Sequence, residues 1–294
     1  MGYSHCTPKL LPQLFRLGLC WARGMRCCHA MGFTPAIRRD DGPHDDDRIA
    51  LFIGAALIVP ALAEPQLPTR AALATLVPAD TVHVGRFGGT AVETASIGED
   101  TVLPAGWQAE TLRPLHGRLP DSEWAIAGRA FQLVEWDRTH RFCGVCGAST
   151  RRLDDERARA CPDCHYRAYP RHSPAVIMLI TRGNEALLGR SAHFPVGMYS
   201  TLAGFVDSGE SAEDAVRREV LEEAGIEITE PQWFGSQSWA FPHSLMLGFT
   251  AEWAAGEIVA DPTEIEDLQW FTRDSLPVLP PPSSIARRLL DAWL

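Results

Sequence analysis

Three carboxylates and an arginine stand close together in residues 204–226, which read GFVDSGESAEDAVRREVLEEAGI. Glu219, Glu222 and Glu223 are spaced i, i+3 and i+4, so a helix places them on one face. Like charges at this spacing repel, but Mg²⁺ or Mn²⁺ between them makes the cluster favourable because these cations prefer carboxylate and water oxygens. The segment therefore predicts a site where a metal-activated water breaks a phosphate anhydride.

The surrounding residues favour the helix that must position this face. Ser211 followed by Asp214 is a capping pair, and Gly225 is a typical residue just past a helix C-terminus. An apolar stripe, on a different face from the glutamates, consists of Ala215, Val216, Val220 and Leu221. The alternative is a solvated surface helix that carries a run of charges.

The whole segment closely resembles the Nudix box, the motif of enzymes that hydrolyse nucleoside diphosphates linked to another group. The resemblance implies that Glu219 and Glu223 bind the catalytic metals and that Glu222 is a further ligand or proton acceptor. It also implies that Arg218 holds a glutamate in place through a charge-assisted hydrogen bond. Glu210 would stabilise the loop before the helix. The identity of the linked group stays open at this point.

A second segment, 236–246, narrows the substrate. Its sequence SQSWAFPHSLM is similar to the SQPWPFPxS signature of the NADH pyrophosphatase family of Nudix enzymes, but Ser238 and Ala240 replace two prolines. Because proline restricts the free chain, we expect a less rigid loop here. Its rings and polar groups can stack on a base and read its edge; the alternative is a strand with two buried aromatics. The predicted substrate-binding residues are Gln237, Ser238, Trp239, Ala240, Phe241, Pro242, His243 and Ser244.

Two CxxC pairs separated by fourteen residues form the third motif. Cys143, Cys146, Cys161 and Cys164 predict a tetrahedral zinc site, and four cysteines leave no position for a catalytic water, so the zinc is structural. A redox CxxC pair or two disulfides are the alternatives, the latter only in an oxidising compartment. The resembling family carries such a zinc ribbon directly before its Nudix domain.

The resemblance also assigns single positions outside the three motifs. It implies that Glu156 and Tyr169 contact the dinucleotide and that Phe205 pairs with the tyrosine around a base. Glu264 would be a late acidic metal ligand, whereas Tyr169 and Phe205 as core aromatics and Glu264 as an exposed charge are the structural alternatives. Two further assignments concern the backbone: the carbonyl of Ala203 at the metal and a contact of Ala286 near the substrate. The family forms homodimers in which the second subunit lends the tyrosine.

Composition indicates a soluble enzyme, and the zinc ribbon and Nudix pairing fit a reducing compartment better than secretion, so we expect a cytoplasmic location. The chain has 294 residues and a formal net charge of −10, which argues against a general nucleic-acid binder but still allows an RNA end to enter one pocket. No apolar run reaches the roughly 18 to 20 residues that span a bilayer. The first residues are rich in arginine and contain no acid before Asp40, as in a transit peptide, and 10–21 loosely resembles a signal core. We favour an over-called start, with Met25 or Met31 as the true one.

These observations predict an α+β protein of four segments. Residues 1–44 are a disordered or mis-called extension, with a solvated acidic linker over 40–47, and 45–138 form a β-rich domain that ends in a helix from Ser122. The zinc ribbon covers 139–170, and a Nudix α/β/α sandwich covers 171–294. The predicted function is hydrolysis of NAD(H) to nicotinamide mononucleotide and AMP, with one zinc and catalytic Mg²⁺ or Mn²⁺. Removal of the NAD cap from RNA and a non-catalytic nucleotide sensor are the alternatives.

Overall fold

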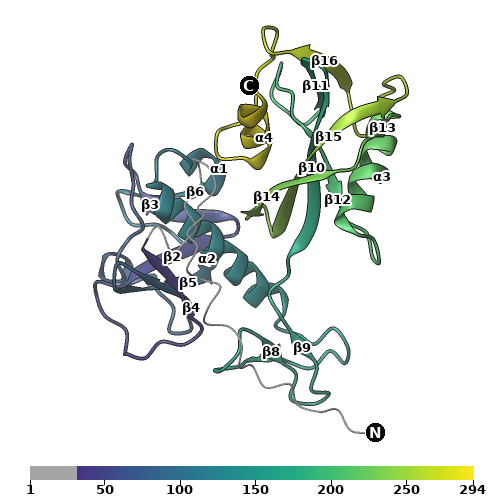
Figure 1. Ribbon diagram of the computed structural model, residues 1–294. Coiled ribbons are helices and arrows are strands. Elements are labelled where there is room, and N and C mark those ends of the chain that lie inside the picture. The colour runs from purple at the N-terminus through teal and green to yellow at the C-terminus, as the bar shows by residue number, and fades with distance from the viewer. Residues whose placement is uncertain (1–31) are drawn as a thin grey trace, which may run out of the picture.

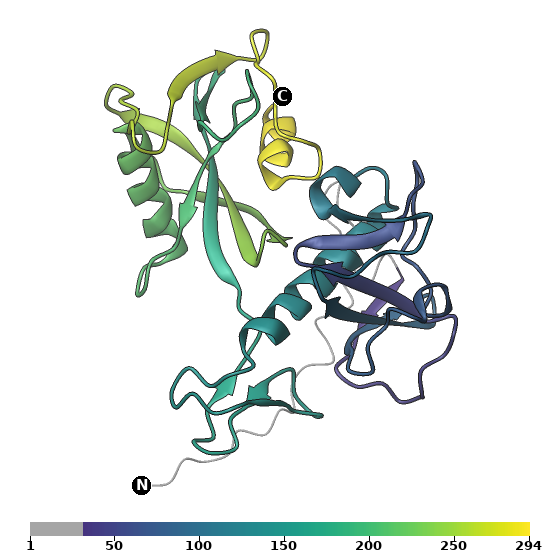
Figure 2. The ribbon, with the colours of Figure 1, turned by 180° about the vertical axis from the view of Figure 1, so that it is seen from behind.

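The computed structural model describes residues 32–294, which fold into three units that follow one another along the chain (Figure 1). A sheet domain in purple and blue comes first, a small unit with short strands follows, and a larger sheet domain in green and yellow ends the chain. Figure 2 shows from behind that the long helix α2, Asp121–Thr139, runs from the first unit to the second. The predicted internal start and its alternatives, a transit peptide or signal core, lie outside the described residues.

The N-terminal domain is a sheet covered by α2, as the β-rich prediction for this part of the chain requires. Within the described residues its strand order is β1-β4-β5-β2-β3-β6. The strands are β1 Phe33–Pro35, β2 Arg48–Ile53, β3 Ala56–Pro60, β4 Val82–Phe87, β5 Thr90–Ile97 and β6 Trp107–Thr111. Two short helices, η2 Ala71–Leu73 and α1 Leu112–Leu115, lie in the connections. The core forms where Phe131 of α2 meets Phe52 of β2, with ring centroids 5.3 Å apart.

Strand β1 shows that the predicted extension over residues 1–44 is wrong for its last part. Phe33 pairs with Phe87 of β4, and its side chain is 1% exposed. Residues 33–35 therefore belong to the sheet. Their pairing partner is about fifty residues away, which is why no local pattern predicts it.

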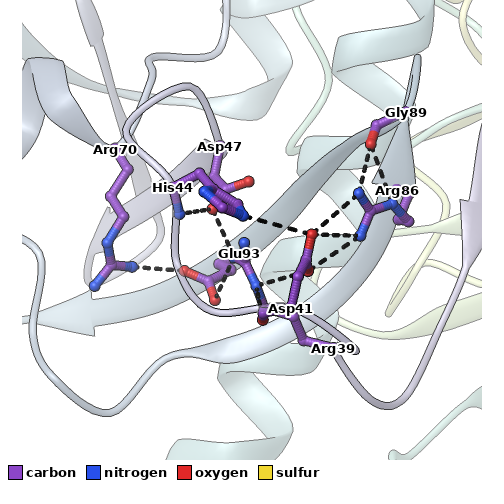
Figure 3. A network of polar contacts seen from close by, with 8 residues as sticks. All are labelled: Arg39, Asp41, His44, Asp47, Arg70, Arg86, Gly89 and Glu93. Carbon is purple, nitrogen blue, oxygen red and sulfur yellow. Dashed lines mark hydrogen bonds and ion pairs between the residues drawn. The ribbon is translucent and has the colours of Figure 1, made fainter.

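Residues 40–46 are exposed, as predicted for a solvated linker, but Asp41 and the buried Asp47 are bound to arginines of the domain (Figure 3). Arg39 donates to Asp47 at 2.6 Å and to Glu93 of β5 at 3.4 Å, and Arg70 donates to Glu93 at 2.6 Å. Burial raises the pKa of Asp47, but hydrogen bonds from Arg39 and the His44 amide outweigh it and hold that pKa below its ordinary value. Arg39 thus keeps the buried carboxylate of Asp47 ionised.

A second contact in the same network fixes the start of the stretch. Asp41 accepts from Arg86 of β4 at 3.3 Å, and the same guanidinium donates to the carbonyl of Gly89 at 2.7 Å (Figure 3). Both partners are exposed, so this pair adds little stability by itself. Its effect is to keep the chain between β1 and β2 against the sheet.

The small unit contains three short strands, β7 Arg151–Arg152, β8 Arg159–Ala160 and β9 Arg167–Ala168. It is attached to the end of α2 through the buried carboxylate of Asp137. Arg152 binds this carboxylate with two hydrogen bonds, of 2.6 and 2.7 Å, and Arg159 binds it as well. Burial raises the pKa of Asp137, but Arg152 and Arg159 outweigh it, so the carboxyl stays ionised.

The C-terminal domain is the predicted α/β/α sandwich. Its sheet has the order β13-β15-β10-β11-β16, with β12 paired to β10 and β14 paired to β15. The strands are β10 Ser173–Arg182, β11 Glu185–Arg190, β12 Leu202–Phe205, β13 Glu227–Ile228, β14 Gln232–Trp239, β15 Ser244–Ala255 and β16 Asp267–Thr272. Helix α3, Ala212–Ala224, and helix α4, Ile285–Trp293, cover opposite faces with separate apolar cores. A turn at Gly183 and Asn184 joins β10 to β11.

Helix α3 has the caps that the sequence predicts. The Ser211 side chain accepts a hydrogen bond from the Asp214 amide at 3.1 Å, and Gly225 ends the helix with φ of 68°, a conformation that favours glycine. Ala215, Val216 and Val220 are buried, as expected, but Leu221 is 57% exposed. In the described part of the chain, no helix combines the length and the apolar character needed to cross a membrane.

Candidate active site

Arg218 holds the acidic face of α3 together. Its guanidinium donates to both oxygens of Glu210, at 2.8 and 2.9 Å, to Glu219 at 2.8 Å and to Glu222 at 2.9 Å. It also donates to the carbonyl of Phe205, at 2.9 Å. The hydrogen bonds from Arg218 lower the pKa of Glu210 to about 2. One cation thus partly offsets the repulsion among the glutamates and ties the helix to the loop before it.

Glu219 and Glu223 are the two buried carboxylates of this face, 8% and 6% exposed. Burial, together with the charges of Glu219 and Glu264, raises the pKa of Glu223 to about 8. Burial also raises the pKa of Glu219 despite its bond to Arg218. Within the described residues, Oε2 of Glu223 has no hydrogen-bond partner. A buried oxygen without a partner, among other carboxylates, fits a divalent cation as the missing partner.

Gly204 makes room for one of these carboxylates. A Cβ at this position would lie 1.9 to 2.1 Å from the carboxylate atoms of Glu219. Gly204 lies in strand β12, opposite Val176 of β10, and not in a turn. Gly209, in contrast, does adopt a positive φ of 86° in the turn before α3. A glycine at position 204 therefore leaves the space that the side chain of Glu219 occupies.

The remaining predicted metal ligands lie around the same face. Glu264 is close enough to raise the pKa of both Glu219 and Glu223, although it comes from the loop before β16. Ala203, on β12, gives Glu223 a backbone hydrogen bond. Glu222 is on the exposed side of the helix, bound to Arg218. The carboxylates are less tightly gathered than the cysteines, because over residues 32–294 only the four cysteines have ligand atoms that are all within 4.8 Å of one another.

The four cysteines of the small unit form a metal site. The Sγ atoms of Cys143 and Cys164 are 3.5 Å apart, as are those of Cys146 and Cys161, and no disulfide joins any of them. Four sulfurs at such distances match the edges of a tetrahedron around zinc, with Zn–S bonds of about 2.3 Å. The paired-disulfide alternative does not describe this structure. The cysteines fit a closed structural zinc site.

Gln237, in the predicted substrate loop, bonds with the protein itself. Its amide donates to the carbonyl of Ser283 at 2.6 Å and accepts from the amide of Ile285 at 2.6 Å. Gln237 is buried and fixes the start of α4, where Ala286 is also buried. This role differs from reading a base edge. At the other end of the loop, the imidazole of His243 is 3.2 Å from the Ser173 hydroxyl, and the buried Ser244 pairs with Ser173.

The middle of this loop contacts the N-terminal domain. The Ser238 hydroxyl donates to Gln132 of α2 at 3.2 Å, and Ala240 is buried in the N-terminal core. The rings of Trp239 and Phe241 meet edge to face, with centroids 4.9 Å apart. A cis peptide bond precedes Pro242, which is exposed.

Glu156 and Tyr169 meet on the small unit. The Tyr169 hydroxyl donates to Glu156 at 2.7 Å, and Arg167 donates to the other carboxylate oxygen at 2.6 Å. Tyr169 is 52% exposed and Phe205 is 62% exposed, so neither is a core aromatic. They belong to different units, and no ring contact joins them among the residues that the structure describes. A single chain therefore leaves the two rings apart.

Comparison with known families divides the chain in the same places. The NUDIX domain matches residues 171–294, the NADH pyrophosphatase zinc ribbon domain matches 138–169, and the NADH pyrophosphatase-like rudimentary NUDIX domain matches 46–136. The last match identifies the β-rich unit, in which the sequence shows no chemical motif, as a second, rudimentary Nudix fold.

Curated relatives are similar over most of the chain. The NAD-capped RNA hydrolase NudC of Pseudomonas aeruginosa (strain LESB58) is 49% identical over 212 residues, which cover 72% of this chain and 76% of the relative. The proteins of the same name from Pseudomonas putida (strain W619) and Stutzerimonas stutzeri (strain A1501) are each 48% identical with the same coverage. The acidic helix, the four-cysteine site and these matches agree, and the chain belongs to the NADH pyrophosphatase, or NAD-capped RNA hydrolase, family of Nudix hydrolases.

Proposed function

We propose that this protein hydrolyses the diphosphate bond of NAD(H) and releases nicotinamide mononucleotide and AMP. The observation that carries the proposal is the pair of buried carboxylates Glu219 and Glu223, one of which has an oxygen without a partner. Such a pair is destabilising in a protein without a ligand and becomes favourable when cations bind. A diphosphate, itself anionic, then binds to the same cations.

The residues of the site have separate tasks in this reaction. Glu219, Glu223 and Glu264 hold the metal ions, and the backbone of Ala203 lies beside them. When bound, Mg²⁺ or Mn²⁺ neutralises phosphate oxygens and lowers the pKa of a water for in-line attack on phosphorus. Glu222 is exposed and held by Arg218, so it would serve as a proton acceptor or further ligand at the edge of the site. Arg218 keeps the glutamates in position.

Conservative substitutions test this assignment. Glu219→Gln and Glu223→Gln remove one negative charge each but keep the size of the side chain, so we expect turnover of NADH to fall by at least about a hundredfold while the circular dichroism spectrum stays unchanged. Glu213→Gln is the matched control, because Glu213 is an exposed acid in the first turn of the same helix. Near-normal rates in either buried variant would refute the proposal.

Removal of the NAD cap from RNA is a second candidate activity of the same site. The curated relatives carry the name NAD-capped RNA hydrolase. The diphosphate chemistry is identical, and only the group attached to the AMP half differs. Rates on free NADH and on an NAD-capped oligonucleotide, measured with the same protein preparation, rank the two substrates. A nucleotide sensor without activity is the weaker candidate, since a sensor does not need the metal-binding acids.

The exposed rings of Tyr169 and Phe205 support a dimeric active site. We infer that Tyr169 of one subunit meets Phe205 of the other around a base, as the family resemblance implies, because both rings are open to a partner. The bonds from Tyr169 and Arg167 to Glu156 would fix the tyrosine for this contact. A cytoplasmic location agrees with four reduced cysteines and remains a prediction.

A further inference from the structure

We propose that the N-terminal domain positions the substrate loop, and that Arg113, Gly128 and Gln132 are the positioning residues. The inference rests on the proposed function and extends it to a domain without chemistry of its own. The hairpin of β14 and β15 points at α1 and α2 in both views (Figures 1 and 2). Three separate contacts join the end of this hairpin, residues 238–241, to these helices.

The first contact is a hydrogen bond across the two domains. The Ser238 hydroxyl donates to Oε1 of Gln132 at 3.2 Å, although the two residues are 106 positions apart in the chain. Gln132 is 8% exposed and Ser238 is exposed, so their bond is partly shielded from water. A hydrogen bond of this kind is enough to bias the position of a loop residue.

The second contact is apolar and requires a glycine in α2. Ala240 is 8% exposed and is part of the N-terminal core, and Phe241 packs against the same core. A Cβ on Gly128 would lie 3.4 Å from the Cβ of Ala240, at the limit of ordinary contact. A larger side chain at Gly128 must therefore push the loop away from the helix.

The third contact is between a cation and two rings. The guanidinium of Arg113, in α1, lies 4.3 Å from the ring centroid of Phe241 and 5.6 Å from that of Trp239. These rings also contact each other edge to face. A cation at these distances is attracted to the ring faces. Arg113 thereby fixes the orientation of the two rings that are predicted to stack on a base.

The contacts fall on the positions where this loop lacks proline. Ser238 and Ala240 stand where the signature quoted above has prolines, and these are the residues that touch Gln132 and Gly128. Proline would restrict the loop before substrate binds. In this protein, contacts with α2 restrict the loop in place of the two prolines. The loop is then ordered only as long as the N-terminal domain holds it.

The kinetic consequence is a change in KM. The loop binds one end of the dinucleotide and not the diphosphate, so its contacts act equally on the ground state and the transition state. We expect Arg113→Ala, Gln132→Leu and Gly128→Leu each to raise the KM for NADH by about fivefold with kcat within twofold of wild type. Hydrogen–deuterium exchange of peptide 236–246 in the substrate-free protein should become faster in all three.

Matched variants separate positioning from stability. Gly128→Ala places a methyl group at an ordinary distance from Ala240 and favours the helix, so KM should stay unchanged. Arg118→Ala breaks the ion pair with Glu110 in the same domain but does not face the loop, so it should lower the melting temperature only. In a Ser238→Ala background, Gln132→Leu should raise KM no further, because their hydrogen bond is already absent.

The outcomes are distinguishable. Wild-type KM in the three variants, or a loss of kcat at constant KM, overturns the inference. If the wild-type protein does not hydrolyse NADH but the loop exchanges faster in the variants, the proposed function fails and the docking of the loop on the N-terminal domain stands.

Discussion

At the scale of single residues, the main feature of the site is that few positively charged groups balance the negative charge of its glutamates. Arg218 binds Glu210, Glu219 and Glu222 at once. One carboxylate oxygen of Glu223 has no partner in the described part of the chain. The raised pKa values of Glu219 and Glu223 show that this balance is incomplete in the metal-free protein. A cation therefore binds to a face that is already arranged and lacks only positive charge.

The space at Gly204 gives a prediction at this scale. In Gly204→Ala the new methyl group would lie about 2 Å from the carboxylate of Glu219, so the carboxylate must move. A displacement of about 1 Å at a catalytic group costs roughly a hundredfold in rate. We expect that loss in kcat for NADH and weaker activation by Mn²⁺. Gly209→Ala is the comparison, because no atom lies within 4 Å of its new Cβ and only the backbone is strained. Equal losses in both variants would contradict the steric explanation.

Glu223 gives a prediction for the metal-free protein at different pH. Its pKa in the folded state is about 8, above the ordinary value of 4.5. Between these values the folded state keeps a proton that the unfolded state has lost, so stability falls as pH rises to about 8 and is then constant. Thermal unfolding in EDTA, from about pH 5 to about pH 9, should show this fall in wild type. Glu223→Gln cannot lose the proton, and its curve should fall less; parallel curves would exclude Glu223 as the cause.

At the scale of elements, the α2 helix connects all three units. It covers the N-terminal sheet, contacts the substrate loop through Gln132, and carries in its last turn Asp137, which binds two arginines of the zinc ribbon. Because Asp137 is buried and ionised, the junction depends on both arginines. The ribbon then carries Glu156 and Tyr169. Loss of order in the ribbon would therefore affect the site without any change in α3.

Zinc removal tests this connection. The four cysteines should hold one zinc per chain, measured by plasma mass spectrometry, and Cys161→Ser should abolish it because Cys161 is buried among the other ligands. We expect faster proteolysis of residues 139–170 and a raised KM for NADH that added Mg²⁺ does not restore. Asp163→Asn, between the two cysteines of the same pair, should keep the metal and the activity. A folded, fully active ribbon without zinc would contradict this role.

The sequence predicts the parts of the site that depend on local signals. The caps of α3, its buried face and the cysteine spacing all arise within about twenty residues, and the structure has each of them. Pairings between distant residues were not predictable. Gln237 bonds to Ser283, 46 positions away, and β1 pairs with β4, so neither has a pattern in its own segment. The role of Gly204 was not predictable either, because the sequence does not show that the side chain of Glu219 occupies the space beside it.

At the scale of the whole molecule, one chain does not bring all predicted substrate contacts together. Tyr169 and Phe205 are exposed on different units. The carboxylates of Glu219 and Glu223, on the other hand, both come from helix α3 of one chain. This division favours an active site at a subunit interface, with the metal from one subunit and a ring from the other.

Mixing two defective variants tests such a shared site. Tyr169→Ala keeps the glutamates, and Glu223→Gln keeps the tyrosine, so a mixed dimer contains one intact site. With random pairing we expect about a quarter of wild-type activity at low NADH concentration after co-expression, more than either variant shows alone. Light scattering should give twice the chain mass of 32.3 kDa. If the mixture only averages the two variants, each site uses the tyrosine of its own chain.

The docking of the hairpin on α2 also affects how such a protein can evolve. Changes of the buried glutamates of α3 would remove the bond-breaking chemistry itself. Changes on the surface of α2 that faces Ala240 alter only how firmly the base-binding rings are held. A rudimentary Nudix-like domain without a catalytic motif therefore still gives natural selection a separate place to adjust which nucleotides are accepted.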